Sequence, residues 1–219
     1  APKPFADQVG SGAHLHFSAW DAATDVNLFY DANGRFGLSR LACQFLAGVL
    51  DHLPALVALS AASVNSYRRL QPRHWSSAYV SYGPDNREAA VRIASEFRGR
   101  EMESANLELK PSDASCNPYL ALGGVIACGL DGIAKELELG EPALQDPDTL
   151  APQERQRLGM HRLPQSLQQA AAALEADDTL KETLGPALHR EYLIVKRAEW
   201  DALCDKDAQA EIAAHFYKY

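Results

Sequence analysis

The fold is decided by one short stretch of sequence, residues 10–19, which reads GSGAHLHFSA. After the glycines, polar and apolar residues alternate, so His14 and His16 lie on one face of an extended chain and Leu15 and Phe17 on the other. A period of two is typical of a β-strand with one buried face. The sequence therefore predicts a strand that carries two imidazoles on a polar surface and packs its apolar side chains on a core.

Later segments repeat this pattern. Apolar and polar side chains alternate over residues 89–93 and again over 106–110, which predicts two further strands. Residues 79–82 are also expected to be extended. The run Gly83-Pro84-Asp85-Asn86, which precedes the strand at 89–93, has the composition of a turn.

Two core helices are predicted in the first two thirds of the chain. Apolar residues recur at helical spacing over 38–53, where Pro54 is expected to end the helix. Asn117 provides a cap for a second helix, which is expected to run to about Leu139. Glycines inside this second helix weaken it unless another backbone packs closely there: Gly123, Gly124, Gly129 and Gly132.

The remainder of the chain is expected to be helical after a surface excursion over residues 141–162. Helices are predicted over 163–176 and over 186–203, and a last one is indicated by the spacing of Ile212, His215, Phe216 and Tyr219. The chain is therefore predicted to be one α+β domain over 1–219, rich in strands over 1–115 and helical over 116–219.

Composition excludes several classes of protein. The chain is 47% hydrophobic and 23% charged, as in ordinary globular proteins. With 21 Lys and Arg against 29 Asp and Glu, the net charge is −8, which argues against binding to nucleic acid or to anionic lipid. The longest apolar stretches are interrupted by charged residues and by Pro54, so no membrane span is predicted. The four cysteines form no CxxC pair, which favours reduced thiols and a cytoplasmic location.

The polar faces of the predicted strands carry the residues suited to chemistry. His14, His16 and Ser18 share one face, and Asn106, Glu108 and Lys110 share another. Imidazole and carboxylate groups together suit a divalent cation or a nucleotide. Solvated strand faces with a Glu108–Lys110 ion pair are the alternative interpretation.

Three arginines form a further candidate group: Arg69, Arg87 and Arg92. Planar guanidinium groups bind carboxylate and phosphate oxygens, although each arginine alone is more often part of a surface salt bridge. No nucleophile elbow, phosphate-binding Walker loop or zinc-protease motif is present. The residues alone indicate a metal and arginine site for an anionic, phosphorylated ligand, at which catalysis would consist of positioning and charge neutralisation.

Several motifs, taken in order, resemble the C-terminal half of the glutamine synthetase family. The similarity is specific from residue 1 to about 133 and rests on Lys3-Pro4, the stretch 10–18, Asn27-Leu28-Phe29, Asn65-Ser66-Tyr67-Arg68-Arg69-Leu70, residues 86–93, Leu107-Glu108-Leu109 and Asn117-Pro118-Tyr119-Leu120. The resemblance implies a catalytic domain of the glutamine synthetase and guanidino kinase type, a curved antiparallel sheet backed by helices. It also implies that this domain is incomplete at its N-terminus.

The resemblance further implies an ATP-dependent ligase. Members of the family activate a glutamate carboxylate as an acyl phosphate, which ammonia or an amine then converts to an amide, with Mg²⁺ or Mn²⁺ bound. The implied roles are His14 and Glu108 as metal ligands, His16, Ser18, Arg87 and Arg92 at the nucleotide, Gly10, Arg69 and Lys110 at the acid substrate, and Arg69 and Arg87 as catalytic groups.

Several residues depart from the family pattern at positions that are expected to bind the substrates. Val9 replaces the usual asparagine before the glycine loop, and Lys110 stands where an arginine normally holds the substrate carboxylate. The loop over residues 71–77 lacks the glutamate that receives the proton of ammonium. The amine is therefore expected to differ from ammonia, as in γ-glutamyl-polyamine or γ-glutamyl-methylamide synthetases.

Two alternatives to a ligase are a non-catalytic homologue that serves as a binding or assembly module, and a guanidino-kinase relative, which the motifs at 14–18 and 117–120 disfavour. Family members form ring-shaped homo-oligomers with shared sites. The fragment alone is accordingly expected to be inactive and to expose an apolar edge.

Overall fold

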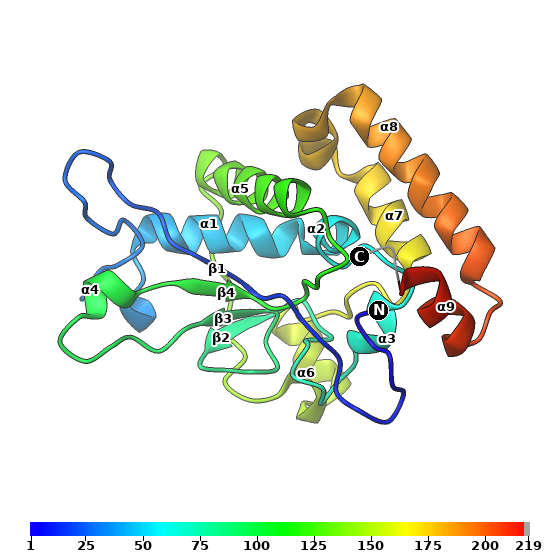
Figure 1. Cartoon of the computed structure of the whole chain (residues 1–219). Helices are drawn as coiled ribbons and strands as arrows, with labels where there is room; N and C mark the ends of the chain where they lie inside the picture. Colours follow the sequence, from blue (N-terminus) through cyan, green and yellow to red (C-terminus); the bar gives the residue numbers. More distant parts are fainter. Residues whose placement is uncertain (217–219) are drawn as a thin grey trace.

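A computed structural model describes residues 1–216 and contains one four-stranded sheet in the order β1-β4-β3-β2 (Figure 1). Its strands are β1 (Leu15–Phe17), β2 (Tyr82–Pro84), β3 (Val91–Ile93) and β4 (Leu107–Leu109). The β1–β4 and β3–β4 pairs are antiparallel, as expected, whereas β2 runs parallel to β3. The predicted turn at 83–86 starts later than expected, because Gly83 and Pro84 still belong to β2.

The sheet register separates an apolar face from a polar one. Phe17, Leu107 and Ile93 lie opposite one another across three strands, and so do His16, Glu108 and Arg92. The apolar row packs on helix α1 (Arg40–Asp51), where the ring of Phe17 lies 5.6 Å from that of Phe45. The polar row is left facing away from this helix, which confirms the alternation expected from the sequence.

Pro54 begins a helix rather than ending one. Helix α1 ends at Asp51, and α2 (Leu53–Ser60) starts directly after His52, with the proline in its first turn. A proline is compatible with the first turn because its missing N–H would have no partner there. Helix α2 is almost wholly buried and forms the centre of the core.

Helix α5 (Pro118–Ala134) packs against α1 at unusually short range. A Cβ atom added to Gly132 would lie 2.6 Å from the Cα of Gly48 on α1, and one added to Gly129 would lie 2.1 Å from the ring of Phe45. The expectation that another backbone approaches this helix at its glycines is therefore confirmed at Gly132. At Gly123, in contrast, a Cβ would meet nothing within 4 Å.

The opposite face of α5 is apolar and exposed. Tyr119 has 85% of its surface accessible, and Leu122, Ile126 and Leu130 continue the same stripe with 45%, 53% and 56%. The spacing of these four residues places them on one side of the helix. We refer to them below as the α5 stripe.

Helix boundaries differ from the expected ones at several places. Helix α5 ends at Ala134 rather than near Leu139, because Glu136 takes a left-handed conformation with φ of 49°. The remaining helices are η1 (Arg35–Gly37), α3 (Ser66–Arg69), α4 (Glu101–Ser104), η2 (Pro147–Thr149), α6 (Pro152–Arg157), α7 (Leu167–Ala176), α8 (Asp178–Leu203) and α9 (Ala208–His215).

Local residues explain the other corrections. Ser166 caps α7 by accepting a hydrogen bond from the amide of Gln169, so this helix starts later than predicted. Asp177 caps α8 earlier than predicted, and the helix is interrupted at Gly185, which precedes Pro186. The expected surface excursion contains η2 and α6. Of the predicted last helix, Tyr219 lies outside the described residues.

His52 joins three parts of the fold. Its Nδ1 atom lies 2.7 Å from Asp177 at the start of α8, and its Nε2 atom lies 2.9 Å from Asp131 on α5. The hydrogen bond to Asp177 raises the pKa of His52, burial opposes this, and Asp131 adds to it, with a resulting pKa of about 9. The imidazolium form therefore links the α1–α2 junction to α5 and to the α7–α8 junction.

No single described helix is long and apolar enough to cross a membrane, although the pair α1–α2, bent by 76°, meets that test by length and composition. The start of the chain and α9 both contact Asn65: its side chain accepts a hydrogen bond from the amide of Lys3 and donates one to Glu211. The two ends of the described chain therefore lie near each other beside α3 (Figure 1).

Candidate functional site

Glu108 is the centre of the polar row on the sheet. Its Oε1 atom lies 2.8 Å from Nδ1 of His14, and its Oε2 atom accepts a hydrogen bond of 2.5 Å from Nε of Arg92. Three adjacent strands or their extensions supply these groups, since β4 lies between β1 and β3. Residues 14, 92 and 108, which are far apart in sequence, thus form one charged cluster.

The surroundings of Glu108 keep it ionised. Its side chain is 6% exposed, and burial by itself raises the pKa of the carboxyl group, but the hydrogen bonds from His14 and Arg92 lower it to about 2. A carboxylate that retains its negative charge at neutral pH is suited to bind a cation or to position a cationic group.

His16 lies beside this cluster, and both His16 and Ser18 have hydrogen-bond partners outside it. His16 places Nδ1 2.8 Å from Oδ1 of Asn106 and Nε2 3.6 Å from Oε1 of Glu108. Ser18 accepts a hydrogen bond of 2.9 Å from the indole of Trp20. Their contact with a nucleotide stays a prediction.

The glycine loop ahead of β1 covers Arg69. A Cβ atom at Gly10 would lie 2.6 Å from Cγ of Arg69, and one at Gly12 would lie 2.8 Å from Nε2 of His14 and 2.9 Å from Nη1 of Arg69. Only glycine fits this spacing without displacing the imidazole or the guanidinium group. The loop therefore brings the predicted substrate contact Gly10 next to Arg69, and places Gly12 against both Arg69 and His14.

Arg69 is fixed in place by backbone oxygens. Its Nη2 atom donates to the carbonyl groups of Ser112 at 2.8 Å and Lys110 at 3.4 Å. Its Nε atom lies 3.9 Å from Oδ2 of Asp113, and within the described chain neither of these two buried atoms has a hydrogen-bond partner. Burial lowers the pKa of Arg69 and the Asp113 carboxylate opposes the shift. The guanidinium group is thus held in place by Nη2, while its Nε–H has no hydrogen-bond acceptor among the described residues.

Lys110 and Arg87 differ in their surroundings. Lys110 is 4% exposed, and burial lowers its pKa while Glu108 opposes the shift. Arg87 is exposed in the turn before β3. The structure therefore brings His14, Arg69, Arg92, Glu108 and Lys110 into one region, whereas no contact links Arg87 to this region within the described residues.

His14 and Glu108 fit part of a divalent-cation site. They provide an imidazole nitrogen and a carboxylate oxygen that converge to 2.8 Å, both acceptable donors for Mn²⁺ and, for the carboxylate, Mg²⁺. Within residues 1–216, no group of three or more His, Cys, Asp or Glu side chains is arranged to hold a metal ion. The described residues therefore supply two ligands, fewer than either cation requires.

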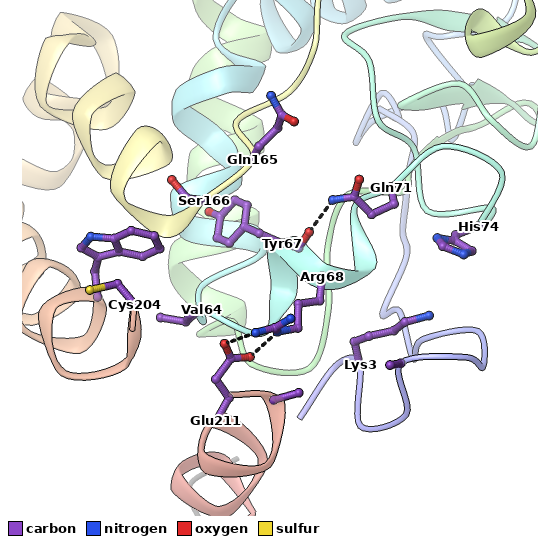
Figure 2. A pocket seen from close by; sticks show the side chains of 13 residues that line it. Lys3, Val64, Tyr67, Arg68, Gln71, His74, Gln165, Ser166, Cys204 and Glu211 are labelled. Carbon is purple, nitrogen blue, oxygen red and sulfur yellow. Dashed lines mark hydrogen bonds and ion pairs between the residues drawn. The ribbon is translucent and has the colours of Figure 1, made fainter. Parts of the chain in front are cut away.

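A cavity of about 520 Å³ lies beside α3, on the side of the C-terminal helices. Figure 2 shows Arg68 paired with Glu211, at 2.7 and 2.8 Å, and Gln71 bonded to the carbonyl of Tyr67 at 2.9 Å. Gln71 and His74 of the 71–77 loop line this cavity. One side of the loop therefore borders the cavity.

Two carboxylates of this region were missed by the sequence patterns. Asp113, which lies beyond the predicted strand at 106–110, is fully buried beside Arg69. Glu88, which immediately precedes the predicted strand at 89–93, accepts a hydrogen bond of 3.0 Å at its Oε1 atom from the amide of Trp75. No periodicity could have indicated contacts between such distant loops.

An ionised carboxylate between an imidazole and a guanidinium, with a second arginine beneath a glycine loop, forms a preorganised charged cluster of the kind that suits anionic groups. The sequence model described as the glutamine synthetase catalytic domain matches residues 1–215. The chain therefore belongs to the glutamine synthetase catalytic-domain family, which confirms the resemblance and extends it beyond residue 133.

Curated relatives include both glutamine synthetases and enzymes for other amines. The chain is 42% identical over its full length to a gamma-glutamylpolyamine synthetase from Streptomyces coelicolor, covering 47% of that protein. It is 39% identical to a glutamate–methylamine ligase from Methyloversatilis universalis and 37% identical to a glutamine synthetase from Methanocaldococcus jannaschii, in each case over 91% of the chain. It covers 44% and 43% of those two proteins.

Solved structures agree with this assignment. A glutamine synthase homologue superimposes with a TM-score of 0.84 at 35% identity, and a GmaS/ADP complex with 0.80 at 36%. These matches cover 100% and 98% of the chain but 48% of each solved chain. The chain thus has the fold of these proteins and spans about half the length of the relatives it matches.

Proposed function

We propose that this chain forms part of an ATP-dependent ligase that joins the side-chain carboxylate of glutamate, or of a related acid, to an amine. One observation carries the proposal: ionised Glu108 is held by His14 and Arg92, and His14 lies beside the glycine loop over Arg69. This is a place where a negatively charged phosphoryl group and a carboxylate can be neutralised side by side.

The proposed reaction has two steps. A carboxylate oxygen of the acid attacks the γ-phosphorus of ATP, the bond to ADP breaks, and an acyl phosphate forms. The neutral amine then attacks the carbonyl carbon, inorganic phosphate leaves, and the proton lost by the amine passes to a base. Bound Mg²⁺ or Mn²⁺, held in part by His14 and Glu108, would neutralise phosphate charge when present.

The residues of this chain are suited to positioning and charge stabilisation. Arg69 is fixed by two carbonyl groups, and its Nη1 atom, which lies at Gly12 beside His14, is the part of the guanidinium suited to bind a carboxylate or phosphate oxygen. Arg92 and Lys110 add positive charge beside Glu108. Because the sheet holds Arg92 and backbone carbonyl groups hold Arg69 before a substrate arrives, little reorganisation is needed when charge develops.

We also propose an amine other than ammonia. The 71–77 loop contains no carboxylate to receive the proton of ammonium, and similarity to polyamine and methylamine enzymes supports the same choice. The test uses the full-length protein with ATP, glutamate and Mn²⁺, and measures phosphate release with ammonium, methylammonium and 1,4-diaminobutane. Release that depends on an organic amine is expected. No release above background with any amine would favour a non-catalytic module instead.

A further inference from the structure

Asp113 is a buried carboxylate whose two oxygens have different surroundings. The residue is completely buried, and its Oδ1 atom accepts hydrogen bonds from the amide of Ser115 at 3.0 Å and from the hydroxyl of the same residue at 2.5 Å. Its Oδ2 atom has no hydrogen-bond partner among residues 1–216 and lies 3.9 Å from Nε of Arg69. The turn that follows Asp113 therefore uses one oxygen, and the other lies beside a guanidinium group.

The turn alone does not account for a charged residue at this place. An asparagine could accept both bonds from Ser115 with its single oxygen, because such turns need one acceptor. A carboxylate removed from water is costly unless a cation compensates its charge. Arg69 is suited to be that cation, since it is 2% exposed and the charge of Asp113 opposes the lowering of its pKa by burial.

The backbone on either side of Asp113 ties this carboxylate to the candidate site. The carbonyl of Ser112 accepts hydrogen bonds from Nη2 of Arg69 at 2.8 Å and from the amide of Ala13 at 3.0 Å. The amide of Asp113 donates to the carbonyl of Ser60, the last residue of α2, at 3.0 Å. The segment that carries the carboxylate is thus fixed both to a core helix and to the end of the glycine loop.

Each nitrogen of the Arg69 guanidinium has a different neighbour. Nη2 is bonded to backbone carbonyl groups, Nε lies toward Asp113, and Nη1 lies at Gly12 beside His14. Because the group is planar and rigid, contacts at Nη2 and Nε determine where Nη1 points.

We propose that Asp113 is the positioning residue of Arg69: its buried carboxylate holds the Nε side of the guanidinium, so that Nη1 is directed toward the anionic acid substrate. The inference rests on the proposed function, because it assigns the orientation of an arginine that binds the acid. Asp113 itself does not contact the substrate in this arrangement.

The first test uses the full-length protein and two variants at the same carboxylate. Asp113→Asn keeps the shape of the side chain, but its one oxygen can face Ser115 or Arg69 and not both. Ser115→Ala is the matched control, because it removes the hydroxyl bond to Oδ1 and leaves the charge in place. Phosphate release with Mn²⁺ gives kcat and the KM values for glutamate, ATP and 1,4-diaminobutane.

The expected result is a change confined to the acid substrate. Asp113→Asn should raise the KM for glutamate about ten-fold, because the guanidinium loses its fixed orientation. The KM values for ATP and for the amine should stay within about two-fold, and all three should do so in Ser115→Ala. A merely structural role of Asp113 would lower kcat, or raise every KM together, in both variants.

A second test needs no substrate. Asp113→Asn leaves Arg69 as an uncompensated buried cation, so its melting temperature should fall. Adding Arg69→Met removes this cation and should recover about half or more of the loss, or restore folding where Asp113→Asn alone does not fold. Arg69→Met added to Ser115→Ala should give no such recovery.

The outcomes distinguish this inference from the proposed function. Absence of recovery by Arg69→Met, or a glutamate KM that is equal in Asp113→Asn and Ser115→Ala, contradicts the role of Asp113. Recovery of the melting temperature without any phosphate release by the unsubstituted protein would contradict the proposed ligase and leave the pairing of Asp113 with Arg69 standing.

Discussion

Glu108 is hydrogen-bonded to His14 and Arg92 and lies close to Lys110, so replacing it should disturb the chemistry of the site. We expect Glu108→Gln in the full-length protein to lower phosphate release by about 100-fold or more, because an amide neither binds a cation nor pairs with Arg92 as strongly. The matched control is Glu154→Gln, which removes an exposed ion pair with Arg157 at 2.7 Å. Phosphate release equal in both variants would contradict the role of Glu108.

Gly12 offers a steric test of the same region. A methyl group there would lie 2.8 Å from Nε2 of His14 and 2.9 Å from Nη1 of Arg69, so Gly12→Ala must displace one of the two. We expect about a ten-fold or greater loss of kcat/KM with little change in melting temperature, since the loop is at the surface. Steady-state kinetics and thermal unfolding of the same preparation check this. Unchanged kinetics would show that the loop moves freely.

At the scale of residues, the sequence predicted the position of a site residue where polar and apolar residues alternate along a strand. The alternation along 14–18 and 106–110 placed His14, His16 and Glu108 on polar faces, and the register of the sheet then aligned His16 and Glu108 with Arg92. Glu88 and Asp113 could not be placed in this way, because each is brought to its partner by a loop. Their roles depend on tertiary packing, which local patterns do not encode.

Helices α1 and α5 provide the clearest test at the scale of elements. Gly132→Ala would place its methyl group 2.3 Å from the carbonyl of Gln44 and 2.6 Å from Gly48, both backbone atoms that cannot move aside. We expect the free energy of unfolding to fall by about 2–3 kcal/mol as the helices separate. Gly123→Ala, on the open side of the same helix, should instead raise it by about 0.5–1 kcal/mol.

Urea unfolding of the two variants measures the difference. Equal effects of the two alanines would mean that the helices do not pack as closely as described.

The existence of the helices was predictable from apolar spacing. Helix ends such as Ala134 and Leu167 were not, because capping residues and the left-handed conformation of Glu136 determine them. The parallel β2–β3 pair was also beyond local patterns, since strand direction depends on the path of the intervening chain.

At the scale of the whole molecule, His52 makes stability depend on pH. Its pKa is raised from 6.5 to about 9, so the stabilisation is fully present below pH 6.5 and is lost as the pH rises through 9. Because His52 is 7% exposed, the loss should amount to about 3 kcal/mol. The free energy of unfolding of the unsubstituted chain should therefore fall between these pH values.

The comparison variant is His52→Gln, which cannot carry the positive charge that pairs with both Asp131 and Asp177. Urea titrations at several pH values should give a difference between the two proteins that is largest below pH 6.5 and shrinks as the pH rises through 9. A difference that does not vary with pH would mean that His52 is neutral in the folded chain.

The α5 stripe has a consequence for handling the chain in solution. Tyr119, Leu122, Ile126 and Leu130 form an exposed apolar strip on a molecule whose net charge of −8 keeps copies apart. Near the pI of about 5.3 this repulsion vanishes while the strip remains, so light scattering should report reversible clouding there. Ile126→Gln, which leaves the net charge unchanged, should suppress the clouding, and equal clouding of both proteins would contradict a role for the strip. Colloidal solubility, and not only folding, thus depends on one face of one helix.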